Sequence, residues 1–501
     1  KGEDAVHIGS AWDMLAHGNW PAPAIAGRPF HEPPLYYWTA ALTGKLFGWL
    51  LPMHEAMRLA SGLWVTLALT GLYYAGRELY GQDKAAASPL LLAGCVGLLI
   101  HAHDAQPMLI ALAAYGGGLG ALAALGRKPR LAGIYYGLSL AACFLGTGIA
   151  PFLPLLAIAP LAWWLAEDRP KATIALGIGL SLGALLTLSW SLLLLYLEPA
   201  RFHGWLNAEL VPLRTPFSWL GAGKFLSMLP WFAFPALPLA IWTVWTRRKA
   251  IHQMPQLLPL AFLLLVFLML ALAYRPREIP ALLLLPALAL LATPGALSLR
   301  RGAASAFDWF AMTTFSFFVL LTWVAWSAMA LGWPTKLAQR AVVLRPGFVG
   351  ELDVMDLVVG LLATLWWVWL IATAPRSPYR SLTHWTLGFT TLWMLATTLI
   401  LPWFDYGKSY RPVIQSIAQV LPAERGCVAE RGLTDTQRAS LAYFAGIEPL
   451  DAETTAGRQC DWVIVTGDTK PELAAPPGRW TRVWEGNRPG DRKEKFRIYR
   501  R

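Results

Sequence analysis

The chain has 501 residues, of which 56% are hydrophobic and only 14% are charged, and its formal net charge is +12. It contains 26 tryptophans, and its apolar runs approach the ~20 residues needed to cross a bilayer. This composition excludes an ordinary soluble domain and predicts a polytopic α-helical membrane protein. The basic residues lie in short connections between hydrophobic helices, so the positive charge does not indicate a nucleic-acid partner.

Residues 1–54 precede the first apolar run, and we expect them to form an external loop with amphipathic helices. Glu3 and Asp4 form an acidic pair that could act as a general base or hold a metal. Alternatively, the pair caps a helix that starts near Ile8. The chain begins without an initiator methionine, and an external start requires a preceding signal or spanning helix, which we expect upstream of Lys1.

Apolar runs along the rest of the chain predict about twelve spanning helices, or about thirteen with the upstream helix. The predicted spans are Glu55–Leu79, Ala85–His101, Asp104–Leu125, Leu131–Leu145, Ile149–Leu165, Ala172–Leu197, Phe225–Trp245, Leu257–Tyr274, Glu278–Leu291, Phe307–Leu331, Val354–Ala374 and Leu382–Leu401. Residues 55–402 are therefore expected to form a transmembrane helical domain.

Basic residues occur in every second connection between these segments. They are Arg77 with Lys84, Arg127-Lys128 with Arg130, Arg169 with Lys171, Arg247-Arg248-Lys249, Arg300-Arg301, and Arg376 with Arg380. Short cytoplasmic loops accumulate Lys and Arg, so these connections are predicted to be cytoplasmic. Residues 1–54, 198–224, 332–353 and everything after Pro402 then lie on the opposite face of the membrane.

Residues 403–501 are polar and punctuated by Gly and Pro, and they are long enough for a small α/β domain. Helices are predicted at Tyr410–Val420 and from Thr434 or Asp435 to Phe444. Strand-like runs follow at Trp462–Val465, Arg482–Trp484 and Phe496–Tyr499. An oxidising compartment would allow Cys427 and Cys460 to form a disulfide, although two buried thiols would fit the same spacing.

Two tight external connections carry ionisable residues, which are costly at a membrane boundary and therefore functional candidates. The first contains His101, His103 and Asp104, which could bind a divalent metal or simply lie at the interface. The second contains Arg275 and Arg277, where the charge bias should exclude cations. Arginine forks suit a lipid phosphate, and Arg58 could join them or extend its side chain to the interface.

The external 198–224 loop contains Arg201, His203, Glu209, Arg214 and Lys224, interleaved with aromatic residues. Such a loop could form a lid, or an amphipathic helix lying on the membrane surface.

The first loop contains the motifs Gly2-Glu3-Asp4-Ala5, Ala11-Trp12-Asp13-Met14-Leu15, Gly18-Asn19-Trp20, Gly27 and Pro33-Pro34-Leu35-Tyr36-Tyr37-Trp38. With these motifs it resembles the first loop of the bacterial GT-C glycosyltransferases, and most closely that of the lipid A aminoarabinose transferases, which are relatives of the protein O-mannosyltransferases. Weaker matches are Glu55, Arg58-Leu59, Ser61, Asp104 and the run from Arg277 through Pro286 and Leu288.

The resemblance implies a GT-C-like fold with a periplasmic C-terminal domain, in a bacterial inner membrane. It also implies sugar transfer from a polyprenyl (undecaprenyl) phosphate donor to a lipid, glycan or protein acceptor. Glu3, Asp4 and Asp104 would be the catalytic acids, and basic residues would hold the departing lipid phosphate. The proposed binding set is Arg58, Arg275, Arg277, Tyr36, Tyr37, His31 and Glu32.

The sequence departs from the family pattern at charged positions. The usual Asp-Glu-Ala-Arg-Tyr reads Glu3-Asp4-Ala5-Val6-His7, and the usual Glu-Lys before Pro-Pro reads His31-Glu32. A common Thr-Lys-Gly reads Gly146-Thr147-Gly148, and a frequent His after Glu209 is Leu210. Two hypotheses follow: an active transferase with a retuned site, or a non-catalytic subunit that acts as a scaffold or as a lipid-binding partner of another membrane protein.

Overall fold

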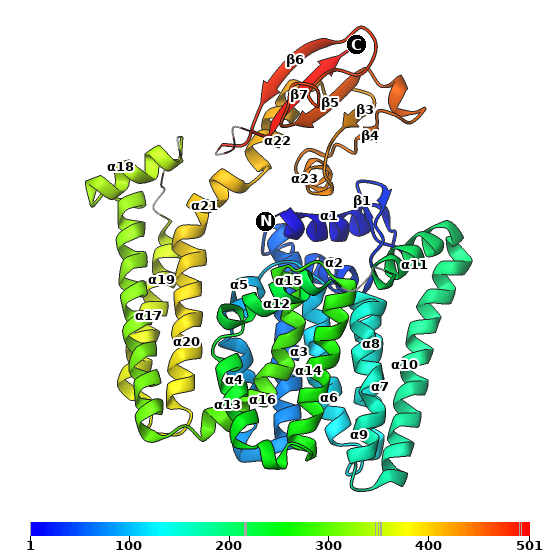
Figure 1. Cartoon of the computed structure of the whole chain (residues 1–501). Helices are drawn as coiled ribbons and strands as arrows, with labels where there is room; N and C mark the ends of the chain where they lie inside the picture. The colour runs from blue at the N-terminus through cyan, green and yellow to red at the C-terminus, as the bar shows by residue number, and fades with distance from the viewer. Residues whose placement is uncertain are drawn as a thin grey trace.

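The protein is described from a computed structural model covering residues 2–214, 218–345, 347–348, 350, 353–489, 491 and 493–501. Three residues of the predicted 198–224 loop, at 215–217, and several of the 332–353 connection lie outside this description. A bundle of long apolar helices forms most of the molecule, and a small sheet domain lies beyond one end of it (Figure 1).

All twelve predicted apolar segments are helical. Among the residues that the structure describes, seven helices or continuous helical stretches are long and apolar enough to cross a membrane, or up to eight if a bent pair is one span. They are α3 (Met53–Tyr80), α10 (Arg169–Leu197), α14 (Met254–Ala273), α15 with η3 and α16 (Glu278–Ala281, Leu282–Leu284 and Leu285–Leu297), α17 (Arg301–Ala330), α19 (Val354–Thr373), and α20 with η4 and α21 (Arg380–Leu395, Ala396–Ile400 and Leu401–Lys408). The chain is therefore a multi-pass membrane protein.

Other predicted spans are shorter or interrupted. They are α4 (Ala87–Ala93) with α5 (Val96–His101), α6 (Met108–Ala123), α7 (Pro129–Thr147), and α8 (Ile149–Ala157) with α9 (Ala159–Leu165). The single span predicted over Phe225–Trp245 is instead two helices, α12 (Trp219–Phe232) and α13 (Ala236–Thr246), bent by 100°. The bend falls at Pro235, which has no N–H to continue the helical hydrogen bonds.

Residues 2–47 cover one end of the bundle. Helix α1 (Gly2–His17) is followed by a short hairpin, β1 (Ala24–Ile25) and β2 (Arg28–Pro29), and by α2 (Leu35–Phe47). Helices α11 (Pro199–Leu213) and α18 (Thr335–Leu344) lie at the same end, whereas the basic connections before α10 and between α13 and α14 lie at the other (Figure 1). Glu3 and Asp4 thus lie in the first turn of a helix rather than on a loop before it.

The C-terminal domain is a five-stranded mixed sheet with two helices. Strand order is β4-β3-β5-β7-β6, with β3 parallel to β4 and β5, and with β7 antiparallel to β5 and β6. The elements are α22 (Arg411–Val420), β3 (Val428–Arg431), α23 (Asp435–Ala445), β4 (Leu450–Asp451), η5 (Gly457–Gln459), β5 (Trp462–Gly467), β6 (Thr481–Gly486) and β7 (Lys495–Arg500). Both predicted helices and all three predicted strands are present. Strands β3 and β4 were not predicted, because they are short and their residues show no strong alternation of apolar and polar side chains.

The two cysteines that were predicted to pair, Cys427 and Cys460, form a disulfide with a Cα–Cα distance of 5.2 Å. Cys95 and Cys143 are buried thiols inside the helical bundle.

Helix α23 packs directly against α1, so the sheet domain rests on the helix that carries the acidic pair. At the crossing, a Cβ atom added to Gly9 would lie 2.4 Å from the Cβ of Ala439. The close approach therefore requires glycine on α1. The same contact is reinforced by Thr436, whose hydroxyl donates a hydrogen bond to the carbonyl of Gly2 at 3.0 Å.

We predict that Gly9→Val separates α1 from α23, because the new side chain cannot fit without moving the helices. Overpacking of this kind costs about 1–3 kcal/mol. The measurement is limited proteolysis of detergent-purified protein, and residues 403–501 should be released sooner than in the parent. Gly177→Val is the control, because nothing lies within 4 Å of a Cβ added there. Equal protection of both variants would contradict the prediction.

Candidate functional site

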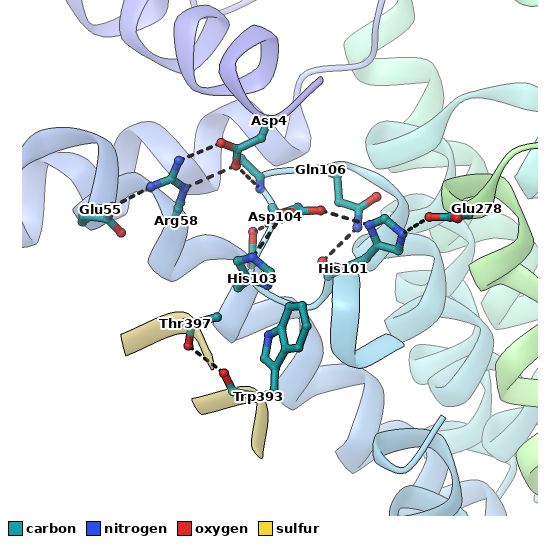
Figure 2. A network of polar contacts seen from close by, with 12 residues as sticks. Asp4, Glu55, Arg58, His101, His103, Asp104, Gln106, Glu278, Trp393 and Thr397 are labelled. Carbon is teal, nitrogen blue, oxygen red and sulfur yellow. Dashed lines mark hydrogen bonds and ion pairs between the residues drawn. The ribbon is translucent and has the colours of Figure 1, made fainter. Parts of the chain in front are cut away.

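Asp4 is buried, and it connects three parts of the chain (Figure 2). Arg58 on α3 donates from Nη2 to Oδ2 at 2.7 Å and from Nε to Oδ1 at 3.3 Å. The backbone N–H of Ala105, between α5 and α6, donates to Oδ1 at 2.8 Å. Burial alone would raise the pKa of Asp4, but the charge and hydrogen bonds of Arg58 and the Ala105 N–H hold the pKa below its usual value. Asp4 is therefore a poor proton acceptor, and its main effect is to hold the first turn of α1 against α3 and the connection between α5 and α6.

Beside Asp4, the connection between α5 and α6 is held by a second set of polar contacts (Figure 2). His101 Nδ1 lies 2.9 Å from Asp104 Oδ2, and its Nε2 lies 3.3 Å from Glu278 on α15. His103 Nε2 lies 3.4 Å from the other oxygen of Asp104. The three candidate metal ligands therefore lie in contact with one another. The imidazoles of His101 and His103 contact different oxygens of the Asp104 carboxylate, and His101 also contacts Glu278.

Two residues that depart from the family pattern, His7 and Glu32, meet at Tyr37. The Tyr37 hydroxyl donates to Glu32 Oε2 at 2.5 Å and lies 2.8 Å from His7 Nδ1. A phenol has one proton, so His7 must donate to the oxygen when Tyr37 donates to Glu32. Burial and the nearby Glu32 raise the pKa of Tyr37 well above its usual value, which keeps that proton in place. His7 Nδ1 thus lies 3.7 Å from Glu32 Oε2.

Tyr36, the neighbouring tyrosine, lies in the protein interior, where its hydroxyl contacts other protein groups. Its hydroxyl lies 2.8 Å from the Ser61 hydroxyl, which donates to the Asp104 carbonyl at 2.9 Å. Tyr36 is fully buried and lines none of the cavities near α1. It joins α2, α3 and the connection that carries Asp104.

A cavity of about 530 Å³ lies beneath α1, where the first loop meets the Arg275–Arg277 connection. Its lining includes the acids Glu3, Glu32 and Glu209 and the bases His7, His31, Arg275 and Arg277. A second cavity of about 540 Å³ is lined by Glu3, Asp4, Asp104, His101 and Arg277. Glu3 and Arg277 line both cavities, and Arg277 Nη1 donates to Glu3 Oε1 at 3.1 Å. The exposed ion pair between Glu3 and Arg277 therefore lies where the two cavities adjoin, and its exposure makes it easy to break.

Arg58 does not join the arginines of the predicted phosphate set. It lines a third cavity, of about 630 Å³, between α1 and the C-terminal domain, and its guanidinium is occupied by Asp4 and by Glu55 at 2.6 Å. Arg275 and Arg277 face the first cavity together. Helix packing decides this separation, because α3 presents Arg58 to α1 rather than to the 275–277 connection.

Glu209, which was noted in the 198–224 loop but not proposed as a site residue, is the additional acid of the first cavity. Its Oε2 accepts a hydrogen bond from the Ile149 N–H at 2.8 Å. A Cβ atom at Gly148, where φ is +82°, would lie 2.1 Å from its carboxylate, so only glycine permits this approach. Burial and the charge of Glu32 raise the pKa of Glu209 to about 7. The available signal in the sequence was its place as an acid among the aromatic residues of the external 198–224 loop.

We predict that Arg58→Gln destabilises the protein at neutral pH by roughly 1–3 kcal/mol, because Asp4 is left buried without its partner. The folded-state pKa of Asp4 is lowered, so its contribution to stability is present above about pH 4 and is lost as pH falls through the folded pKa. Thermal unfolding from pH 3 to 8 should therefore show a gap between variant and parent that closes at low pH. Glu55→Gln removes the exposed partner of Arg58 and serves as the control; a pH-independent gap would contradict the prediction.

Glu209→Gln should have the opposite pH signature. A carboxyl with a raised pKa favours the folded state while protonated, so its contribution is lost as pH rises from about 4.5 to about 7. The variant should match the parent at pH 4 and unfold at a higher temperature than the parent above pH 7. Scanning calorimetry at both pH values measures this difference, and a variant less stable than the parent at pH 8 would refute it.

Comparisons with known proteins place this geometry in context. No family model matches the sequence. The chain is 30% identical over 256 residues to undecaprenyl phosphate-alpha-4-amino-4-deoxy-L-arabinose arabinosyl transferase 1 of Sodalis glossinidius. That match spans 47% of this chain and 44% of the relative, which is less than half the length of each.

Two crystal structures of ArnT from Cupriavidus metallidurans share the fold over nearly the whole chain. The undecaprenyl phosphate complex has a TM-score of 0.69 at 17% identity, and the apo structure has a TM-score of 0.70 at 18% identity. Both alignments cover 99% of this chain and 93% of ArnT. The chain thus has the fold of ArnT and a sequence similar to that of an aminoarabinosyl transferase, which confirms its predicted resemblance to the bacterial GT-C glycosyltransferases.

Proposed function

We propose that this protein is a membrane glycosyltransferase that moves a sugar from a polyprenyl phosphate donor to a lipid acceptor. The observation that carries the proposal is the cavity beneath α1, in which a carboxylate, Glu3, faces two arginines, Arg275 and Arg277. Displacement at an anomeric carbon requires a proton acceptor and a cationic site for the phosphate leaving group. The ArnT structure with the same fold was solved with undecaprenyl phosphate, which supports a donor of this class.

In the proposed reaction, Glu3 accepts a proton and the two arginines stabilise the leaving phosphate. The acceptor hydroxyl attacks the anomeric carbon and gives its proton to Glu3, while the bond from that carbon to the phosphate oxygen breaks. The negative charge that develops on the phosphate is stabilised by the guanidinium groups of Arg275 and Arg277. Because Arg277 pairs with Glu3 before substrate binds, a bound phosphate would compete for Arg277 and release Glu3 to act as the base.

Asp4 and Asp104 have supporting roles in this proposal. Asp4 is held by Arg58 and Ala105, and it fixes the first turn of α1 so that Glu3 reaches the cavity. Asp104 orients His101 toward Glu278 beside the second cavity. His31 and Glu32 line the first cavity together with the arginines and are suited to contact the sugar.

The proposed location is a bacterial inner membrane, with α1 and the sheet domain on the periplasmic side. The basic connections at the opposite end of the bundle support this orientation. We propose a division of the chain into a first periplasmic segment at 1–54, a transmembrane domain at 55–402 and a periplasmic α/β domain at 403–501. Catalysis then takes place where the first segment meets the membrane surface.

The test is sugar transfer by the full-length protein in liposomes that contain a polyprenyl-phosphate-linked sugar and a lipid acceptor. Glu3→Gln should lower kcat by about a hundredfold or more, because the base is lost. Arg277→Gln should weaken donor binding by about tenfold or more, since charged hydrogen bonds contribute roughly 1.5–3 kcal/mol each. Glu453→Gln, an exposed acid of the sheet domain, is the control.

Full activity of Glu3→Gln would remove Glu3 from the mechanism. No transfer by the parent with any lipid-linked sugar would contradict the enzymatic proposal and favour a non-catalytic subunit. Direct binding of polyprenyl phosphate, measured in the same liposomes, separates loss of donor binding from loss of chemistry.

A further inference from the structure

A cluster of three metal-ligating side chains lies at the other end of α1, away from the cavity that contains Glu3. Asp13 and His17 lie one turn apart on α1, and Glu448 comes from the loop after α23. One ligand atom from each residue can be chosen so that all three lie within 4.8 Å of one another. His17 Nδ1 lies 3.4 Å from Asp13 Oδ1, and His17 Nε2 lies 3.0 Å from Glu448 Oε1. Among the residues that the structure describes, this is the only such group.

Asp13 supplies an independent indication of a ligand. Its side chain is only 2% exposed, and its Oδ2 has no hydrogen-bond partner among the described residues. Its Oδ1 accepts the Gly27 N–H at 2.9 Å, which fixes the orientation of the carboxylate. A buried carboxylate oxygen without a hydrogen-bond partner is costly, and metal-bound carboxylates are typically oriented by a hydrogen bond of this kind. The free oxygen and the fixed orientation are what a cation site requires.

We propose that Asp13, His17 and Glu448 bind a divalent transition-metal ion, with zinc the best fit. One imidazole and two carboxylates are ligands that zinc accepts, and water would complete a tetrahedral set. Two ligand atoms in a tetrahedral zinc site with bonds of about 2.0–2.1 Å are separated by about 3.4 Å, so ligand atoms that now lie within 4.8 Å of one another need to move by roughly 1–1.5 Å. The imidazole must also turn, because its two nitrogens now face different carboxylates. His17 and Glu448 are 39% and 44% exposed, which leaves their side chains free to adjust.

The ion would fasten the C-terminal domain to α1. The same interface contains Arg28, whose Nη2 forms an ion pair with Oε1 of the buried Glu430 of strand β3 at 2.8 Å. A metal link beside this ion pair would hold α1 at its C-terminal end, while Asp4 holds its first turn. The site is separate from the candidate ligands His101, His103 and Asp104, and it does not depend on the proposed enzymatic function.

The test is metal binding by the full-length, tag-free protein in detergent, stripped with a chelator and titrated with Co²⁺ or Zn²⁺. Co²⁺ binding is followed by visible absorption and Zn²⁺ binding by calorimetry. We expect one ion per chain, and His17→Ala or Glu448→Gln should weaken binding by about tenfold or more. His252→Ala, an exposed histidine in the connection before α14, should bind as the parent does.

Zinc should also raise the unfolding temperature of the parent but not that of His17→Ala. Glu448→Gln is nearly isosteric, so its loss of binding at unchanged metal-free stability would exclude a folding defect. If the parent shows no saturable binding, or if His17→Ala binds as tightly as the parent, the ion is adventitious and the proposal is overturned. In that case His17 serves only as a hydrogen-bonded bridge between two carboxylates.

Discussion

The buried ion pair between Asp4 and Arg58 is the interaction on which the candidate site depends. It joins the first turn of α1 to α3, and through the Ala105 N–H it reaches the connection between α5 and α6. Glu3, the residue before Asp4 on α1, lines the first cavity, while Asp4 is held by Arg58 and Ala105. A buried pair of this kind is weak evidence for stability but costly to break. Its main consequence here is positional, since it fixes which of two adjacent acids is exposed and can pair with Arg277.

The departures from the family pattern are connected in space. His7 and Glu32 both contact the Tyr37 hydroxyl, so the change of a cation to an anion at one position is accompanied by a basic side chain at another. Glu209 faces the same cavity with a raised pKa. The cavity lining therefore combines three glutamates with two arginines and two histidines.

The fold holds α1 between two bodies. On one side the helical bundle contacts it through Arg58 and the 101–105 connection, and on the other the sheet domain contacts it through α23 and Glu448. Gly9 permits the close approach of α23. Any movement of the sheet domain would thus be transmitted to the helix that carries Glu3, which makes the interface a natural place for a stabilising metal.

The sequence by itself determined the class of the protein, the apolar segments, the helices and main strands of the C-terminal domain, and the first-loop resemblance. These follow from local hydrophobicity, periodicity and motif, which are properties of neighbouring residues. It did not predict the bend at Pro235 or strands β3 and β4, because short elements carry little pattern. Only the tertiary structure decided that Asp4 is occupied while Glu3 is exposed, that Arg58 lies apart from Arg275 and Arg277, and that Glu209 shares their cavity. Each of these depends on packing between segments far apart in the chain, and burial and charge pairing at such contacts cannot be read from either segment alone.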